Sequence, residues 1–512
     1  MKQTKTHCFL LLLLILAVRS GAQEYNSVPL DHDAYDIIAM GVMQGIILSP
    51  PAAKPWPLFM VKEKLWEMID DPAQILSSDE SEVVSRVIDS FDRKTGFQPE
   101  DGRYRTEGAN ATFEIGLNWA SNFSIKTPDA SSASMNVLNL YSGGDIADFA
   151  SWNINPKAYA VWPDDPALSY GLEGELNGAF FDQHALLRLG RVRRGWGRGS
   201  GENSLFINTH AHPFTALEGT VSPLSWLNIS FLGGALERFN ENKQWPNNEP
   251  FTNMLAAAQV EFNPSIYIHL SMGGGAVLLK QPNTAFFTDL ELRLPGLFTL
   301  WGSFFTDHLN SSSGNFFSMN GSSYAYQAGI RTVIHWLPLA AFTLSYTRIQ
   351  PYCYTGESNS PDSGFISGGE SLGYYLPPNS DELLARFEYM LFTAIKTYVQ
   401  FQMIRHGVDY GYGAVGGSSL YDTLADNRSA GHFLKDGVYQ WDNIIKLGGS
   451  CNLKTGSGAH GVPLSIYGEA GLVGTNFIMN DVDNETNNEP RSDSIYQPST
   501  YFVFSVGFRV FW

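Results

Sequence analysis

The last twelve residues, Tyr501–Trp512, read YFVFSVGFRVFW. Because successive side chains of a strand point to opposite faces, one face of this segment is wholly apolar and consists of Phe502, Phe504, Val506, Phe508, Val510 and Trp512. A strand of a soluble sandwich can alternate in the same way, but so apolar a strand would aggregate unless both its edges were paired. A closed barrel in lipid supplies both the pairing and apolar surroundings. The segment therefore predicts the closing strand of a transmembrane barrel.

The composition agrees with a barrel. The chain has 512 residues, of which 13% are aromatic and 16% charged, so it is long enough for one large barrel and an additional domain. A formal net charge of −18 argues against a nucleic-acid partner. Three cysteines predict neither a disulfide framework nor a metal or redox centre, and no cofactor is expected. Whether Cys353 and Cys451 pair stays open.

Residues 1–22 have the pattern of a secretory signal peptide. Lys2 and Lys5 precede the apolar run Phe9–Val18, and small residues at 20–22 resemble a cleavage site. No later apolar run approaches the ~20 residues that a membrane-spanning helix needs. An exported chain of this kind is expected to cross a membrane with strands.

Residues 24–100 have helical periodicity instead. Apolar stripes predict helices over Ala34–Leu48, Leu58–Asp70 and Ser78–Lys94, separated by proline-rich or polar segments. They predict a small helical domain, followed by a glycine-containing linker and by a barrel over residues 109–512.

From about Thr112 onward the apolar period changes to two. We count about eighteen strands, with sixteen as the alternative: near 111–121, 135–142, 155–162, 168–180, 184–192, 213–221, 226–237, 254–262, 265–277, 285–294, 297–306, 323–334, 339–349, 382–392, 397–405, 438–453, 463–475 and 501–512. Long and short connections alternate through most of this region, as in outer-membrane barrels with short periplasmic turns. An even count places both ends of the barrel, and the helical domain, in the periplasm.

Charged residues occupy the strand faces opposite the apolar ones. Because Arg or Lys on the lipid face near the bilayer midplane costs about 2–4 kcal/mol, such residues are expected to face the lumen. The predicted lumen-facing charges are Arg188, Glu261, Asp289, Glu291, Arg293, Arg386 and Glu388. A lumen with both signs of charge is either a wetted pore or is closed by ion pairs, and the pattern favours partial closure.

An arginine cluster interrupts this otherwise acidic chain between residues 189 and 223. Its candidate ligand-binding residues are Arg191, Arg193, Arg194, Trp196 and Arg198. Arginine recognises carboxylates with paired donors and tryptophan offers a flat face to a sugar, so one interpretation is contact with an acidic polysaccharide. The other is a loop folded into the barrel, with its arginines paired to lumen acids such as Glu261 or Glu291. Glycines at 195, 197, 199 and 201 permit tight bends in either case.

The same stretch resembles the capsule-assembly outer-membrane family, the Wzi-like proteins. The matching positions are Gly190, Arg191, Trp196, Gly197, Gly199, Ser204, Leu205, Ala211, Pro213 and Phe214. Further similar patches are Val28-Pro29, the helix at 36–47, Leu372–Tyr375, Pro378–Leu383 and Ile404–Gly407. The chain departs from the pattern at Arg198, where the family more often has proline.

This resemblance implies an eighteen-stranded barrel of the cell outer membrane with a periplasmic helical bundle, which binds or organises surface or capsular polysaccharide without catalysis. Resemblance to outer-membrane proteins in general implies that Phe508, Val510 and Trp512 are read by the barrel-assembly machinery. The expected partners are outer-membrane lipid, that machinery and an acidic polysaccharide. The alternative function is a porin or a gated channel for small or apolar solutes. Enzyme and metal sites are not expected, since His210 and His212 lack a third ligand nearby.

Overall fold

A computed structural model describes residues 25–511 apart from positions 72, 74, 92–95, 99–102, 108–111, 128–130, 147–149, 164–166, 182, 198–203, 238–252, 280–281, 310–322, 338, 357–362, 392–394, 408–416, 423–432, 435–437, 456–461 and 480–496. The predicted signal peptide, Arg198 and Trp512 lie outside the described residues.

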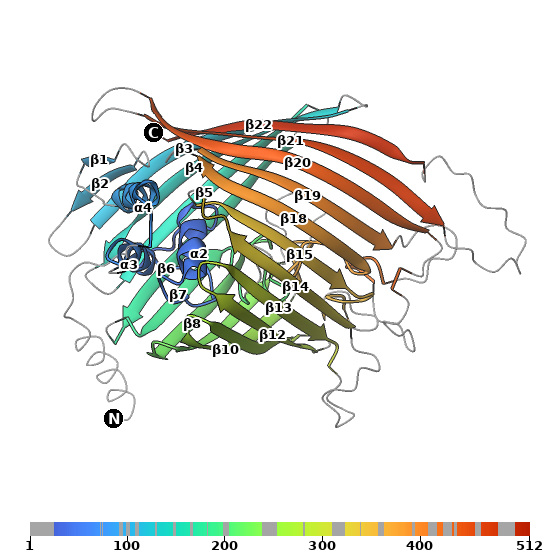
Figure 1. The fold of residues 1–512 in the computed structure, drawn as a ribbon, viewed down its shortest axis with the longest axis horizontal. Coiled ribbons are helices and arrows are strands. Elements are labelled where there is room, and N and C mark those ends of the chain that lie inside the picture. The colour runs from blue at the N-terminus through green and yellow to red at the C-terminus, as the bar shows by residue number, and fades with distance from the viewer. Residues whose placement is uncertain are drawn as a thin grey trace, which may run out of the picture.

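The described chain forms a closed antiparallel barrel of eighteen strands (Figure 1), as the alternation of apolar residues predicted. The strands are β3 (Thr112–Lys126), β4 (Ser131–Ile146), β5 (Ala150–Pro163), β6 (Ala167–Phe180), β7 (Ala185–Val192), β8 (Phe214–Leu224), β9 (Leu227–Leu236), β10 (Asn253–Ser265), β11 (Ile268–Val277), β12 (Asn283–Leu294), β13 (Phe298–Asp307), β14 (Ser323–Val333), β15 (Ala341–Ile349), β18 (Ser380–Leu391), β19 (Ile395–Gly407), β20 (Val438–Thr455), β21 (Val462–Met479) and β22 (Ser499–Phe511).

Strand β22 closes the barrel, as its sequence predicted. It pairs with β21 on one edge and with β3 on the other, so that Val510 lies between Leu464 and Trp119. The β22–β3 ladder begins at Asn118, and β2 (Arg103–Glu107) pairs with the part of β3 that precedes it. Strand β1 (Gly96–Gln98) pairs in turn with β2, so the expected linker contains a hairpin that covers an otherwise open strand edge.

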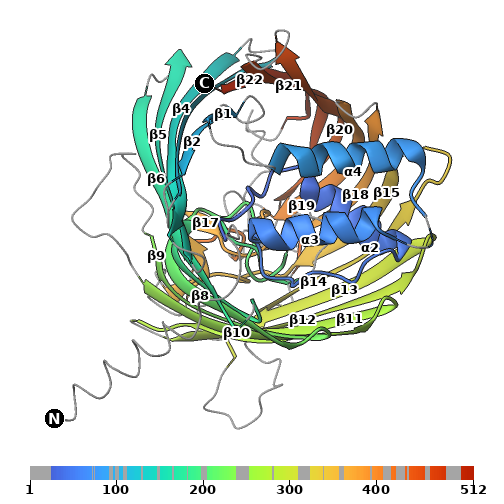
Figure 2. The ribbon, with the colours of Figure 1, turned by 90° about the vertical axis from the view of Figure 1, so that its left-hand side faces the viewer.

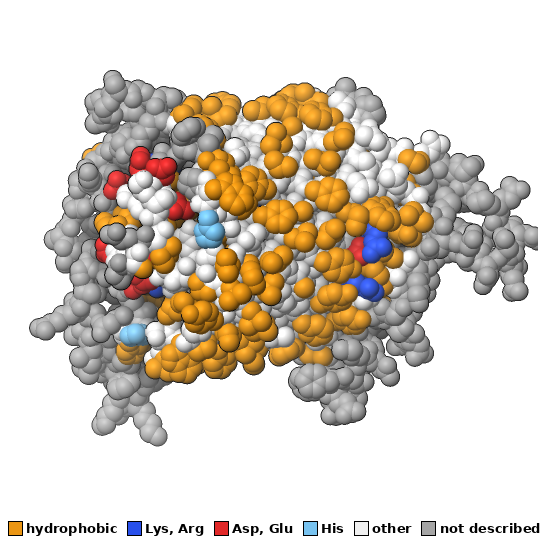
Figure 3. Space-filling view, in the orientation of Figure 1, with side chains coloured by type: hydrophobic (Ala, Val, Ile, Leu, Met, Phe, Trp, Pro, Cys, Tyr) orange, Lys and Arg blue, Asp and Glu red, His pale blue; other side chains and the backbone are white. Residues whose placement is uncertain are grey.

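The outer surface of the barrel carries the apolar register of each strand. Leu189, Leu290 and Phe504 are 51%, 42% and 37% exposed, whereas the alternate positions on their strands face inward. Hydrophobic side chains are spread over the described barrel surface in Figure 3, and the largest patch of Lys and Arg side chains visible there lies toward the end away from the helices. The surface is therefore suited to a hydrocarbon environment.

The three predicted helices are present as α2 (Ala34–Gln44), α3 (Leu58–Ile69) and α4 (Ser78–Phe91). Helix α4 begins with a capping box, in which Ser77 and Glu80 exchange hydrogen bonds. No helix of the described chain is long and apolar enough to cross a membrane.

The helices lie within the outline of the barrel at one mouth (Figure 2). They contact the short turns there, because the Gly296 amide donates to the Met43 carbonyl at 2.9 Å and the Leu339 amide donates to Glu80 at 3.2 Å. We call this mouth the short-turn end. The helices and the barrel therefore share one apolar core, in which Ile38 and Val61 belong to the same cluster as Ala341.

Candidate functional site

Three segments meet inside the barrel. The inner loop is residues 193–213, which connect β7 to β8 and are described at 193–197 and 204–213. The second loop is residues 350–379, which connect β15 to β18 and are described apart from 357–362. The strap is residues 49–57, between α2 and α3. Together we call them the plug.

A single buried carboxylate organises the inner loop. Glu218 on β8 accepts hydrogen bonds from Arg188 Nη1 at 2.9 Å, from Arg194 Nε at 3.2 Å and from Trp196 Nε1 at 2.9 Å. All four side chains are mostly or wholly buried, with Trp196 and Arg194 only 0% and 1% exposed. Three donors on one carboxylate offset much of the cost of burying its charge.

Arg194 also donates hydrogen bonds to backbone carbonyls at the adjoining ends of β7 and β8. Its two terminal nitrogens donate to the backbone carbonyls of Val192, Phe214, Gly190 and Ala216 at 2.7–3.3 Å. Burial lowers the pKa of the Arg194 guanidinium, and the charge and hydrogen bond of Glu218 oppose this shift. The donors of Arg194 are thus occupied by the protein, which leaves neither Arg194 nor Trp196 accessible to a polymer in this structure.

The strap ties the plug to the wall. Arg188 Nη2 donates to the Pro55 carbonyl at 2.6 Å, and the Ala52 amide donates to Glu261 at 2.7 Å. Lys54 and Gly195 exchange two backbone hydrogen bonds, of 2.8 and 3.1 Å. The strap and the inner loop are therefore joined as two short strands would be.

Two glycines make this close approach feasible. A Cβ atom at Gly195 would lie 2.6 Å from Thr209 Cγ2. Gly197 has a φ of 89°, and a Cβ atom there would lie 2.8 Å from Ser204 Oγ and 2.9 Å from Asp289 Oδ2. The tight bend that the sequence indicated at these positions is therefore a bend into the lumen.

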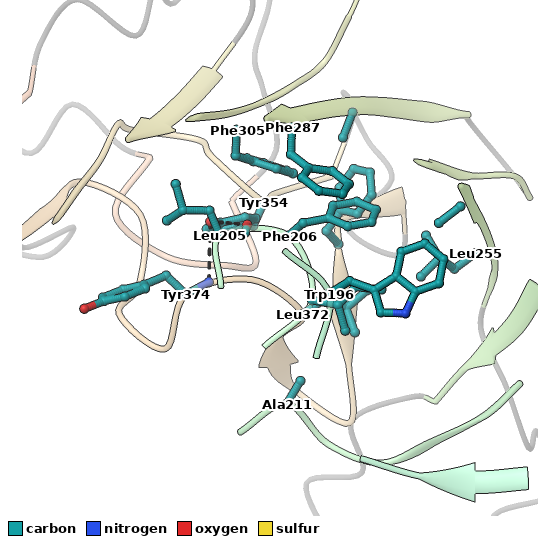
Figure 4. Close-up of a cluster of buried hydrophobic side chains, with 14 of the residues drawn as sticks. Trp196, Leu205, Phe206, Ala211, Leu255, Phe287, Phe305, Tyr354, Leu372 and Tyr374 are labelled. Atoms are coloured by element: carbon teal, nitrogen blue, oxygen red, sulfur yellow. Dashed lines mark hydrogen bonds between the residues drawn. The ribbon is translucent and has the colours of Figure 1, made fainter. Parts of the chain in front are cut away.

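Aromatic side chains fill the space between the two loops and the wall (Figure 4). The Phe206 ring stacks on Phe287 of β12 with centroids 4.5 Å apart, and Phe305 of β13 packs 4.8 Å from Tyr354. Tyr354 Oη donates to the Leu205 carbonyl at 2.8 Å, so the second loop holds the inner loop directly. Every strand from β8 to β15 contributes to this buried cluster. One side of the lumen is consequently filled by a dry core.

Two cysteines remain free in the described chain. Cys353 lies in the second loop and is fully buried, and burial raises the pKa of its thiol well above the ordinary range. Cys451 lies on β20. The structure thus resolves the open question by showing no bond between them.

Arg191 and Arg193 of the arginine cluster are less buried than Arg194. Arg191 is paired with Glu237 through Nε at 2.5 Å, and His212 lies 3.3 Å from the same carboxylate. Arg193 follows the end of β7 and is exposed. The described residues contain no group of three or more His, Cys, Asp or Glu side chains that could hold a metal ion.

The seven residues expected to face the lumen alternate with outward apolar residues on their strands. Glu261, Asp289, Glu291 and Arg293 are buried within the filled side, where Arg293 Nη2 donates to Glu291 at 2.5 Å. Arg386 pairs with Glu388 at 2.6 Å. Among the described arginines of the cluster, Arg194 of the inner loop pairs with Glu218 and Arg191 of β7 pairs with Glu237, rather than with the example acids Glu261 and Glu291. These two acids were missed because a single Glu within or just after an alternating strand resembles any other lumen charge.

The opposite side of the lumen is polar and half-exposed. Lys157 of β5 pairs with Glu173 of β6 at 2.8 Å, and Lys446 of β20 pairs with Glu469 of β21 at 3.1 Å. These side chains retain between 21% and 32% of their exposure. The lumen is therefore divided into a dry side, made by β8–β15 and the plug, and a wetted side.

An ion pair between Asp36 of α2 and Lys396 of β19 joins the helices to the wetted side. Burial raises the pKa of Asp36, but the charge and hydrogen bond of Lys396 outweigh it, so the pKa lies below the usual 3.8. A carboxyl whose folded pKa is depressed stabilises the fold above its unfolded pKa and loses that contribution as the pH falls through the folded value. We expect acidification from about pH 5 to about pH 2 to lower the protection of the α2 amides, measured relative to the intrinsic exchange rate at each pH.

Asp36→Asn should raise exchange in α2 at neutral pH and flatten its acid dependence, as measured by hydrogen-exchange mass spectrometry. Asp79, in the first turn of α4, gives the matched control Asp79→Asn. An acid response in Asp36→Asn equal to that of the unmodified protein would contradict the role of this pair.

Comparisons with known proteins bear on the fold. No family model matches the chain. No curated protein sequence matches it either. Among solved structures, the fold is similar to that of Wzi of Escherichia coli, described as an outer-membrane protein involved in group 1 capsule assembly and as a carbohydrate-binding β-barrel. The TM-score is 0.59 at 13% identity, with 95% of this chain and 99% of that chain covered.

Two barrels of Pseudomonas aeruginosa are more distantly similar. OccK11 (OpdR) has a TM-score of 0.45 at 10% identity and covers 82% of this chain and 97% of its own. OprD has a TM-score of 0.43 at 11% identity, with 83% and 97% covered. The Wzi-like resemblance read from the sequence is thus confirmed at the level of the fold, and the chain is a β-barrel of the outer-membrane type.

Proposed function

We propose that this protein is a non-catalytic outer-membrane barrel that binds or organises surface polysaccharide. The observation that carries the proposal is the plug: three segments fill one side of the lumen with a dry core, which the buried ion pair of Arg194 with Glu218 joins to the wall. A barrel built mainly for free diffusion would not need so extensive a filling. The similarity in fold to a capsule-assembly barrel also supports a role in binding surface polysaccharide.

The short-turn end is the periplasmic end in this proposal. The helices contact the short turns at Gly296 and Leu339, and Arg509 near the end of β22 lies 3.3 Å from Asp31 at the start of the helical segment. Short turns on the periplasmic side are the rule for outer-membrane barrels. Arg193 then lies toward the cell exterior, where a polymer would be met.

The arginine cluster has two roles in this proposal. Arg194 and Trp196 position the inner loop from within the barrel, and exposed Arg193 contacts acidic groups of the polymer. Replacing Arg193, Arg194 and Trp196 together would not separate polymer contact from plug stability, because it would also disrupt the plug. A single exposed arginine therefore gives the cleaner test.

We expect cells that lack this protein to release surface polysaccharide into the medium, and the unmodified gene to restore retention. Arg193→Gln should restore it only partly, with several-fold more polymer in the medium. Arg509→Gln, which removes an exposed charge near the other end of the barrel, is the matched control. Full retention in cells without the protein would overturn the proposed function.

A gated channel is the second candidate function, favoured by the wetted side with its half-exposed pairs Lys157–Glu173 and Lys446–Glu469. Such a channel would pass small solutes along β3–β6 and β18–β22. A steady open conductance of the unmodified protein in planar bilayers, together with unchanged polymer retention, would favour the channel.

A further inference from the structure

A cavity of about 140 Å³ lies where the helical segment, the plug and the barrel wall meet. Its lining includes Tyr35 and Trp56 from the N-terminal segment, Gly197 and Thr209 from the inner loop, and Thr299 and Trp301 from β13. Its size suits one ligand no larger than a monosaccharide. We call it the junction cavity.

Three buried side chains of the wall carry polar atoms that no described residue satisfies: Thr299 Oγ1, Trp301 Nε1 and Arg331 Nε. These residues line the junction cavity and are 7%, 6% and 8% exposed. A buried polar atom without a hydrogen bond costs about 1–3 kcal/mol. Three of them beside one cavity indicate a place built for a polar ligand.

The strand register brings these three side chains together. Thr299 and Trp301 are two residues apart on β13, so they share its inner face. Arg331 of β14 is the direct partner of Thr299 in the ladder, and Gly329 is the partner of Trp301. A Cβ atom at Gly329 would lie 2.1 Å from the Trp301 ring, so the indole occupies the space that this glycine leaves.

Glu388 holds the guanidinium of Arg331 in place through one of its terminal nitrogens. Its Nη2 donates to Glu388 at 3.0 Å, while its Nε has no partner among the described residues. The guanidinium and indole N–H groups can only donate, so they select a ligand group that accepts. A carboxylate is the acceptor that an arginine edge and a neighbouring donor fit best.

The N-terminal segment lines the cavity with aromatic surface. Tyr35 and Trp56 stack with centroids 4.7 Å apart, and Lys54 Nζ lies 5.3 Å from the Trp56 ring. Four basic and three acidic side chains line the cavity. Its surroundings therefore combine flat apolar surface, unsatisfied donors and a small excess of positive charge.

We propose that the junction cavity binds one carboxylated sugar unit, with its carboxylate against Trp301 Nε1 and Arg331 Nε and its hydroxyls near Thr299. The choice of a sugar rests on the proposed function, because carboxylated sugars are the building units of acidic surface polymers, and the cavity has room for one such unit. The site is separate from Arg193 and lies at the junction with the helices.

The test is calorimetric titration of the full chain in detergent with sodium D-glucuronate, with D-glucose as the neutral comparison. We expect glucuronate to bind at least ten-fold more tightly than glucose. Trp301→Phe, which retains an aromatic ring, and Thr299→Val, which retains the shape, should each weaken glucuronate binding about ten-fold. Trp162→Phe, on the outer face of β5, should leave binding unchanged.

Equal glucuronate affinity in Trp301→Phe, Thr299→Val and the unmodified protein would overturn the site. Heat-modifiable migration on gels verifies that each variant barrel is folded. The two proposals fail separately. If glucuronate does not bind, the proposed site is wrong, but release of polymer from cells that lack the protein would still support the proposed function. If those cells retain their polymer, the proposed function is wrong even if glucuronate binds.

Discussion

Replacing Glu218 with alanine should destabilise the plug by about 3–5 kcal/mol, because it leaves the buried Arg194 guanidinium without its carboxylate. Arg194 is 1% exposed, so water cannot take the place of Glu218, whereas Arg188 keeps Glu175 as a second carboxylate at 3.2 Å. The indole N–H of Trp196 loses its acceptor in the same step. Hydrogen-exchange mass spectrometry should show loss of protection across 193–197 and 204–213, with protection of the barrel strands β18–β22 largely preserved.

Glu173→Ala is the matched control for this experiment. Glu173 also pairs with a basic side chain of a neighbouring strand, at 2.8 Å, but both partners are partly exposed on the wetted side. Exposed pairs contribute about 0–1 kcal/mol, so protection of the inner loop should not change. Similar effects of the two substitutions would show that Glu218 does not organise the plug.

Phe206→Ala should open a path through the filled side of the lumen. Phe206 is 1% exposed and contacts Phe287, Phe305, Phe365 and Trp196 with ring centroids 4.5–6.4 Å apart. Truncating a buried Phe costs about 3–5 kcal/mol, part of which is the cavity that remains. We expect larger and more frequent conductance steps in planar bilayers than for the unmodified protein.

The control for this effect is Phe504→Ala, on the outer face of β22, where the side chain is 37% exposed and faces away from the lumen. It removes the same atoms without touching the plug, so conductance should match that of the unmodified protein. If Phe206→Ala conducted no more than Phe504→Ala, the aromatic core would not be the barrier.

The barrel could be predicted from the sequence because lipid imposes a strict period of two. Residues such as Leu290 and Leu292 alternate with Asp289 and Glu291, and no other environment keeps so many apolar side chains on one face of every strand. Strand lengths were less predictable. Strand β5 runs from Ala150 to Pro163 through Pro156, beyond the expected 155–162. Its ladder with β4 lacks partners at 155 and 156, because proline has no amide proton to donate.

The site was only partly predictable. The arginines and glycines near residue 195 indicated an unusual loop. Its two interpretations were contact with a polysaccharide and folding into the barrel. Which acids the arginines meet depends on the pairing of β7 with β8, which places Arg188 directly opposite Glu218. The junction cavity was not foreseen, because Tyr35, Thr209 and Trp301 come together only after the helices enter the barrel.

The double backbone bridge between Lys54 and Gly195 has a consequence for biogenesis. The strap lies inside the wall that β22 completes, and Asp31 meets Arg509 across a separation of 478 residues. Closing a ring around its own N-terminal segment is a long-range event, and long-range contacts slow folding. We infer that the N-terminal segment with the strap is already in position when β22 pairs with β3, and that this last pairing encloses it. Substitutions in the strap should therefore appear as slow or incomplete membrane insertion as well as altered ligand binding.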